Sequence, residues 1–257
     1  MTGRGSYTSA LAVGGFVPPQ SAITESWNGS SWTEVGDLNT AKYGLGSAGA
    51  DNTSVLVFGG YDGSSYQDQM ESWNGSSWTE TTNMNTDRGT GGSAGTVTSA
   101  LYYGGEHPAK ANTESWNGSS WTEVSDLNES KYGVGGSGVD NTSALAFGGY
   151  NPSATANTEL WNGSSWAEQN NLNTARAQLA NGGAGSTTAA LAYGGASPPV
   201  VGATEEWNTE TPVGAWATDA NMNTGRGNLG SAGTYTASIG FAGIGNQLVP
   251  LYYFRNH

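Results

Sequence analysis

The sequence contains no cysteine, and among its 257 residues there are two histidines and eight lysines or arginines. Without cysteine there is no disulfide framework, thiolate metal site or thiol nucleophile. The two histidines, His107 and His257, are too few for a histidine-rich metal centre. We therefore expect neither a metal nor a cofactor, and no catalytic residue stands out.

Basic charge is also scarce, because 21 acidic residues outnumber the basic ones and give a net charge of -13. A surface of this kind is unsuited to a nucleic-acid backbone or to an anionic membrane. The N-terminal stretch MTGRGSYTSALAVGG has one arginine and a short apolar run broken by glycine, so it does not resemble a signal peptide. No segment has membrane-spanning length. We expect no nucleic-acid partner and no membrane insertion.

Three markers recur in a fixed order with a period of about 45 residues. The hexapeptide WNGSSW begins at Trp27, Trp73, Trp116 and Trp161, and a longer version, WNTETPVGAW, begins at Trp207. Each unit also contains a Gly-Gly pair, of which the first is Gly14-Gly15 and the last Gly194-Gly195. A single basic residue completes the set: Lys42, Arg88, Lys131, Arg176 and Arg226. Internal repetition of this kind predicts a repeat architecture.

Each unit reads as four short strands, as in YGLGSAGA, TSVLVFGG, QDQMESWNG and SSWTETTNM. Helix-period apolar patterns are missing, and 41 glycines disfavour helices. Four strands in a unit of this length are typical of a propeller blade. We predict an all-β protein, a β-propeller of four-stranded antiparallel blades that forms one domain over residues 1–257. Its units are 1–40, 41–86, 87–129, 130–174 and 175–224, followed by a closing strand and tail over 225–257.

The hexapeptide is predicted to be a hairpin, because Asn-Gly favours a type I′ turn between two strands. A two-residue or a four-residue loop places both tryptophans on the same face of the hairpin. All ten tryptophans of the chain lie in these hairpins. They are either the core between blades or platforms for stacking sugars. We favour the core, because indoles bury a large apolar area.

The order of basic residue, small strand, hydrophobic strand ending in Gly-Gly, and then Trp resembles the Kelch repeat. One copy reads AKYGLGSAGADNTSVLVFGGYDGSSYQDQMESWNGSSWTE, and the resemblance covers nearly the whole chain. WNGSSW is a tighter turn than the family's usual loop. The near-identical, Gly-rich and acidic copies are similar to Kelch-like arrays predicted in phages and aquatic bacteria. The resemblance implies a propeller that binds partners on one face.

Closure of the ring allows two solutions. Arg4 lies ten residues before Gly14, whereas Lys42 lies 17 before Gly59, so we expect the first unit to lack a full first strand. The segment RGNLGSAGT, from Arg226, is predicted to pair into the first blade and seal a ring of five blades by strand exchange. The following TASIGFAG and LVPLYYF are consistent with a sixth blade instead. The apolar terminus LVPLYYFRNH either packs under a blade or docks on an assembly partner.

Positions that differ between copies are free for recognition, and the segments after Gly-Gly differ most. They are rich in Pro, Gly, Ser and Asn, so they are loops that join the second strand to the third. We expect ligand contacts at Tyr61, Asp62, Tyr66, His107, Lys110, Tyr150 and Asn151. The alternative is that these are ordinary solvated loops.

The repeated basic residues are expected to ring the axial channel. One interpretation is a site for an acidic ligand, in which Arg88 and Arg176 are ligand-binding residues. The other is that each pairs with a glutamate of its own or an adjacent blade, for example Glu34 or Glu80.

The function that we predict is a non-enzymatic recognition module that presents these loops to a glycan or a protein, at a virion or cell surface. The alternative is a purely structural role as a decoration or spacer in a larger assembly. A glycoside hydrolase is a more distant alternative, since glutamates occur in every unit. The compartment itself is not assigned by the sequence.

Overall fold

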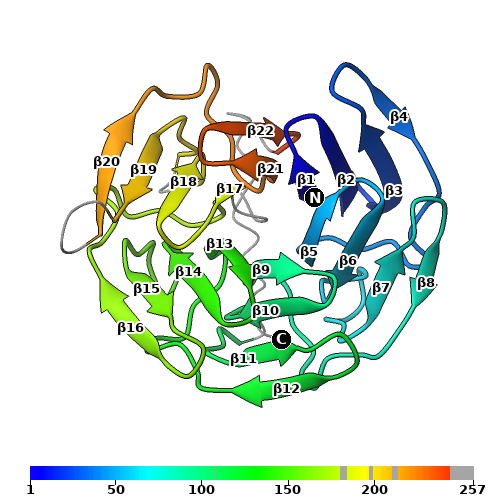
Figure 1. The fold of residues 1–257 in the computed structure, drawn as a ribbon, viewed down its shortest axis with the longest axis horizontal. Coiled ribbons are helices and arrows are strands. Elements are labelled where there is room, and N and C mark those ends of the chain that lie inside the picture. The colour runs from blue at the N-terminus through cyan, green and yellow to red at the C-terminus, as the bar shows by residue number, and fades with distance from the viewer. Residues whose placement is uncertain (107, 180–183, 197–198, 210–213, 244–257) are drawn as a thin grey trace.

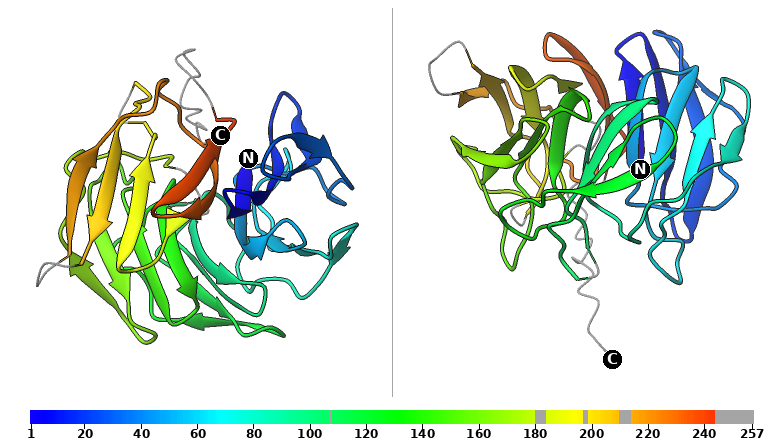
Figure 2. Two further views of the ribbon diagram at one scale, coloured as in Figure 1. Left: turned by 45° about the horizontal axis from the view of Figure 1, so that its top comes forward. Right: turned by 60° about the horizontal axis from the view of Figure 1, so that its bottom comes forward.

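The computed structural model describes residues 1–106, 108–179, 184–196, 199–209 and 214–243, and all of its regular elements are strands. They form five four-stranded antiparallel sheets and one two-stranded sheet arranged around an axis (Figure 1). The predicted five-bladed propeller is therefore confirmed. Two further views show the same ring tilted about the horizontal axis, with the sheets standing around the centre (Figure 2).

Each blade is a meander in which the strands pair in chain order. The first blade contains β1 (Thr2–Ser6), β2 (Ser9–Phe16), β3 (Gln20–Trp27) and β4 (Trp32–Glu34), and the second contains β5 (Gly46–Asp51), β6 (Ser54–Phe58), β7 (Met70–Trp73) and β8 (Trp78–Glu80). The third contains β9 (Gly92–Thr96), β10 (Ser99–Tyr103), β11 (Thr113–Trp116) and β12 (Trp121–Val124). The fourth contains β13 (Gly135–Asp140), β14 (Ser143–Phe147), β15 (Thr158–Trp161) and β16 (Trp166–Gln169). The fifth contains β17 (Ala184–Gly185), β18 (Ala189–Tyr193), β19 (Thr204–Asn208) and β20 (Ala215–Asp219).

The C-terminal strands β21 (Gly230–Thr234) and β22 (Ala237–Phe241) pair with each other and form the sixth sheet. The inner strand β21 contacts β17 on one side and β1 on the other, so it closes the circle of inner strands. Figure 1 shows this sheet in red beside the blue first blade. The C-terminal segment thus closes the ring, and the inner half of the alternative sixth blade is present.

The predicted strand exchange into the first blade is wrong. Residues Thr2–Ser6 supply the first blade's own inner strand, paired with β2 from Thr2↔Val13 to Ser6↔Ser9. The distance from Arg4 to Gly14 misled the prediction because in the later units the basic residue lies in the link before the inner strand. In the first unit Arg4 lies within that strand, where its guanidinium donates to the carbonyls of Ser47 at 2.9 Å and Ser93 at 3.1 Å.

Of the two loop lengths predicted for the repeated hairpin, the structure has the four-residue loop, with Trp27 opposite Trp32. The Oδ1 atom of Asn28 accepts hydrogen bonds from the backbone N–H groups of Ser30 and Ser31, each at 3.0 Å. Gly29 has a φ of 93°, whereas Asn28 is not left-handed. The turn is therefore an Asx turn rather than the predicted type I′ turn, and asparagine acts through its side chain.

The tryptophans form the core between blades, as predicted. In each of the four later hairpins both indoles are at most 7% exposed, and they pack on the second strand of the preceding blade. Phe58 and Trp121 pack edge to face with ring centroids 5.0 Å apart, and Tyr103 and Trp166 do so at 4.9 Å. Buried indoles therefore join one sheet to the next, which allows Gly-rich strands to form a stable ring.

Candidate functional site

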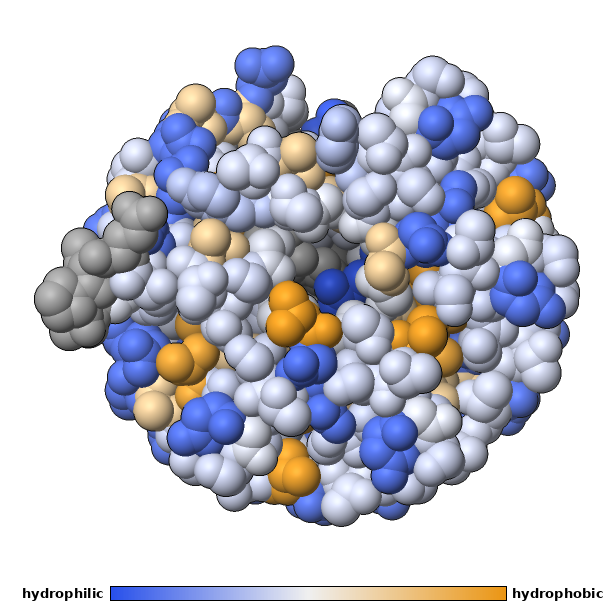
Figure 3. All heavy atoms as spheres, viewed as in Figure 1, coloured by the Kyte–Doolittle hydropathy of each residue, from blue (hydrophilic) through white to orange (hydrophobic). Residues whose placement is uncertain are grey.

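The variable loops and the links that carry the basic residues lie on the same end of the blades, as the topology requires. Isolated backbone bridges join the two kinds of segment in four blades: Tyr43↔Tyr61, Gly89↔Glu106, Tyr132↔Tyr150 and Ala177↔Ala196. This end of the propeller is called the loop face here. Figure 3 shows the ring with its hollowed centre. Over the visible face, apolar residues are scattered rather than gathered into one patch.

The links between blades are joined to one another by backbone hydrogen bonds. The N–H of Thr90 donates to Gly44 O at 2.7 Å, and each later link repeats this contact with the link before it through Gly133, Gln178 and Asn228. All five residues have a left-handed φ between 54° and 68°. Thr90 is the strained member, since β-branched residues rarely adopt this conformation, and its hydroxyl is buried without a partner. We call this chain of contacts the link relay.

Four aromatic rings lie in contact on the loop face over the first two blades. Phe16 contacts Tyr43 at 5.3 Å, Tyr43 contacts Tyr61 at 5.6 Å, and Tyr61 contacts Tyr66 at 5.0 Å between ring centroids. Phe16 is exposed and the three tyrosines are half-buried. Two predicted residues, Tyr61 and Tyr66, thus belong to one group. We refer to Phe16, Tyr43, Tyr61 and Tyr66 as the aromatic row.

The aromatic row is held by polar contacts at its sides. Burial and the carboxylate of Glu106, a residue of the third blade, raise the pKa of Tyr66 well above its ordinary value. Burial and Glu106 also raise the pKa of Tyr43 to about 12. Both hydroxyls consequently stay protonated at neutral pH and can act as hydrogen-bond donors.

Asp62 shapes the loop beside the row. Its Oδ1 accepts hydrogen bonds from Ser64 N at 2.7 Å and Ser65 N at 2.8 Å, while its Oδ2 accepts one from Gln67 Nε2 at 2.8 Å. These hydrogen bonds, that from the backbone of Ser65 first, lower its pKa, so the carboxylate remains ionised. The side-chain amide of Gln20, from the first blade, donates to the Asp62 carbonyl. The loop is therefore ordered before any ligand arrives.

Two of the predicted residues lie on the fourth blade, away from the row. Tyr150 packs on Tyr132 with ring centroids 5.3 Å apart, and Asn151 Nδ2 donates to Ser130 O at 2.5 Å. Lys110 belongs to the third blade, where its backbone N–H donates to Gly105 O at 2.8 Å. His107 lies outside the described residues. The predicted contacts thus divide among three blades.

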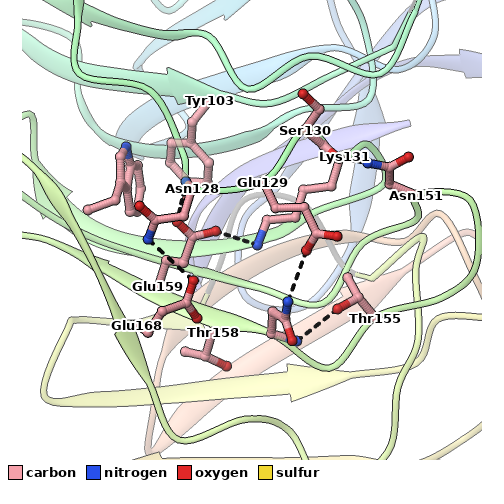
Figure 4. Close-up of polar contacts among 12 residues, drawn as sticks. Tyr103, Asn128, Glu129, Ser130, Lys131, Asn151, Thr155, Thr158, Glu159 and Glu168 are labelled. Carbon is pink, nitrogen blue, oxygen red and sulfur yellow. Dashed lines mark hydrogen bonds and ion pairs between the residues drawn. The ribbon is translucent and has the colours of Figure 1, made fainter.

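The repeated basic residues are placed differently from the prediction. Lys42, Arg88, Lys131 and Arg176 do not line the axis. Each is 0% exposed and pairs with a glutamate of the third strand of its own blade. The N···O distances are 3.4 Å to Glu71, 2.5 Å to Glu114, 2.7 Å to Glu159 and 2.9 Å to Glu205. Figure 4 shows the pair of Lys131 and Glu159.

These ion pairs favour the structural interpretation of the basic residues over the ligand site. Burial lowers the pKa of Lys42 and of Arg176, with the neighbouring glutamate acting in the opposite direction. The partner is the buried glutamate of the third strand, not Glu34 or Glu80 of the outer strand as we expected. Arg88 and Arg176 are thus enclosed and already paired, and a ligand on the surface does not reach them.

The sequence analysis missed four residues of the loop face, namely Phe16, Tyr43, Tyr132 and Glu106. A sequence pattern could have indicated the two tyrosines. Where a unit has Lys-Tyr-Gly, at 42–44 and 131–133, its Gly-Gly pair is followed by tyrosine, at 61 and 150. Units with arginine at this position have no tyrosine in either place. The two tyrosines occur together because they are bridged partners.

Comparison with known proteins assigns no family, since no family model matches the chain and no curated protein matches it. Among the described residues, no group of three or more histidines or acidic residues is arranged to hold a metal ion. The same part of the chain has no helix long and apolar enough to cross a membrane.

Proposed function

We propose that this protein is a Kelch-like recognition module whose loop face binds a glycan through the aromatic row. The observation that carries the proposal is the row itself, in which four rings from two blades lie in contact and remain partly accessible. The C–H faces of a sugar ring stack on such aromatics, and the neighbouring amides and hydroxyls supply hydrogen bonds.

The electrostatics of the loop favour binding over hydrolysis. A glycosidase requires a carboxylic acid whose pKa is raised, so that it protonates the leaving group. The pKa of Asp62, beside the row, is lowered by its hydrogen bonds. The low count of basic residues also argues for a neutral sugar rather than a sialylated or sulfated one. A phage or cell-surface setting would suit this activity.

A glycan array probed with the full chain tests the proposal. We expect reproducible binding to one class of neutral glycan, and a loss of at least about tenfold in affinity for Tyr61→Ala, since stacking residues are typical hot spots. Tyr7→Ala is the matched control, because Tyr7 is 53% exposed in the turn after β1, at the opposite end of the blade. Absence of binding to any glycan, or equal losses in both variants, would refute the proposal and favour a structural role.

A further inference from the structure

Among the described residues, the sixth sheet has two strands, and an open site lies beside it. A cavity of about 450 Å³ is lined by residues of the fifth blade and of the C-terminal sheet, including Leu191, Tyr193, Thr204, Arg226 and Phe241. Figure 3 shows an indentation of the rim at this place, between the C-terminal sheet and the first blade. In every other blade this position is filled by the third and fourth strands, which form the Trp-containing hairpin.

The filled interfaces show which groups receive a hairpin. At three of the four filled interfaces, the second tryptophan packs edge to face on the aromatic residue that ends the preceding blade's second strand, as Trp216 does on Phe147 at 5.0 Å. At the interface between the first and second blades, Trp78 packs in a cluster with Val13 instead. At three of the four filled interfaces, the Nε1 of the second tryptophan donates to a threonine of the preceding blade's third strand, as from Trp216 to Thr158 Oγ1 at 3.0 Å. Trp78 and Trp166 make the same bond, also at 3.0 Å, to Thr24 and Thr113.

The glutamate of the hairpin is received by two further groups. It pairs with the buried basic residue of its blade, and its second oxygen accepts the backbone N–H of an asparagine in the preceding link. The distances from asparagine N to glutamate Oε2 lie between 2.6 and 2.8 Å in four blades: Asn39–Glu71, Asn85–Glu114, Asn128–Glu159 and Asn173–Glu205. Each hairpin is therefore bound to its neighbours through one carboxylate and two indoles.

The open site has every receiving group in the corresponding position. Tyr193 is the aromatic residue, Thr204 the hydroxyl acceptor, Asn223 the link asparagine and Arg226 the cation, and all of them line the cavity. Arg226 is exposed, unlike its four fully buried counterparts, and within the described residues it makes no ion pair. Leu191 is half-buried, whereas Leu101 and Leu145 at the same position are 0% exposed.

The opposite wall is also incomplete. Trp32 packs on Phe241 at 4.9 Å in the usual edge-to-face manner, yet Trp27 and Trp32 are half-buried, because the part of the sixth sheet that the structure describes has no third strand to cover them. Among the described strands, β22 pairs with β21 alone, so its outer edge is open. An added strand would extend this sheet and cover both walls, in the manner of β-augmentation.

We propose that this site binds a β-hairpin of a partner polypeptide with the pattern Thr-Glu-x-Trp-Asn-Gly-Ser-Ser-Trp. Its glutamate would neutralise Arg226, its tryptophans would pack on Leu191 and Tyr193, and its first strand would pair with β22. Residues 244–257 contain neither glutamate nor tryptophan, so they do not carry this pattern. A hairpin from outside residues 1–257 would then occupy the site in the way that each repeated hairpin packs on the blade before it.

The direct test uses a synthetic hairpin and the full chain. The peptide TESWNGSSWTEV, whose sequence is that of residues 113–124, is closed by terminal cysteines in a disulfide, because a free hairpin is marginally stable in water. It carries a fluorescent label for anisotropy. We expect saturable 1:1 binding, and no binding of the same peptide with both tryptophans changed to alanine. Failure of the closed peptide to bind at concentrations on the order of 1 mM would overturn the proposal.

A charge exchange tests the role of Arg226 without relying on stability. Arg226→Glu should weaken binding at least about tenfold, and a peptide with lysine in place of its first glutamate should bind this variant better than the unaltered protein. Lys110→Glu changes the same charge on another blade and should leave binding unchanged. Equal affinities of the peptide for all three proteins would also contradict the proposal. Neither experiment involves the aromatic row, so its failure is distinguishable from failure of the proposed function.

Discussion

The interface between the third and fourth blades and that between the fifth blade and the C-terminal sheet present the same groups to the next hairpin. In the first, Tyr103, Thr113 and Lys131 are covered by Trp166 and Glu159. In the second, Tyr193, Thr204 and Arg226 line a cavity. The comparison shows that the receiving groups of the fifth blade keep their positions where no described hairpin covers them, so a further hairpin would add its contacts to a blade that is already formed. In a repeat protein stability is approximately a sum of such neighbour terms.

The largest expected contrast concerns the tryptophans. Trp166→Ala removes a side chain that is 6% exposed and packed between two blades, so we expect a loss of about 3–5 kcal/mol in the free energy of unfolding. Trp32→Ala, at the half-buried wall of the open site, should cost less than half as much. Denaturant unfolding followed by circular dichroism measures both. Equal losses would show that the first blade is as well covered as the others.

The ion pairs give the next contrast. Glu159→Gln leaves the ammonium of Lys131 buried without its counter-ion, and we expect a loss of about 3 kcal/mol. Arg226→Ala should change stability by less than about 0.5 kcal/mol, because the guanidinium is exposed and pairs with no described carboxylate. The same unfolding assay applies. A large loss for Arg226→Ala would mean that the open site is already filled in solution.

The smallest contrast is a single hydrogen bond. Thr158→Val keeps the shape of the side chain but leaves the Nε1 of Trp216 buried without an acceptor, which should cost about 1–2 kcal/mol. Thr204→Val, at the open site, should be neutral within about 0.5 kcal/mol. The interface between the second and third blades supplies a natural parallel. Met70 replaces the threonine there, and the Nε1 of Trp121 is buried without a partner. The hairpin peptide should nevertheless bind the Thr204→Val variant more weakly than it binds the unaltered protein.

The architecture was predictable because the residues that recur in every unit are those that pack between blades. Pairs of tryptophans at a fixed spacing, joined by Asn-Gly, specify a hairpin whose apolar face must be buried in every unit. The closure was not predictable in the same way. Whether RGNLGSAGT enters the first blade or forms its own sheet depends on whether Thr2–Ser6 already occupies the inner position. That five-residue strand shows no hydrophobic alternation of its own.

The candidate site was predicted in part for a physical reason. Tyr61, Asp62 and Tyr66 follow one another in a variable loop, so the comparison of units found them. Tyr43 and Glu106 come from other segments and are brought to the row by the ring. The burial of the repeated basic residues was missed because four of the five units have two glutamates directly opposite each other, such as Glu71↔Glu80. Sequence alone does not say which of the two lies inside.

The link relay has a consequence for variation. Because the links are tied to one another close to the axis, their lengths fix the angular step from each blade to the next. The loops after the Gly-Gly pairs contact the links through bridges such as Tyr43↔Tyr61, but they take no part in the link relay itself. They can therefore be lengthened or exchanged one at a time without rotating their neighbours. Selection or design can thus diversify the loop face while the angles between the blades stay constant.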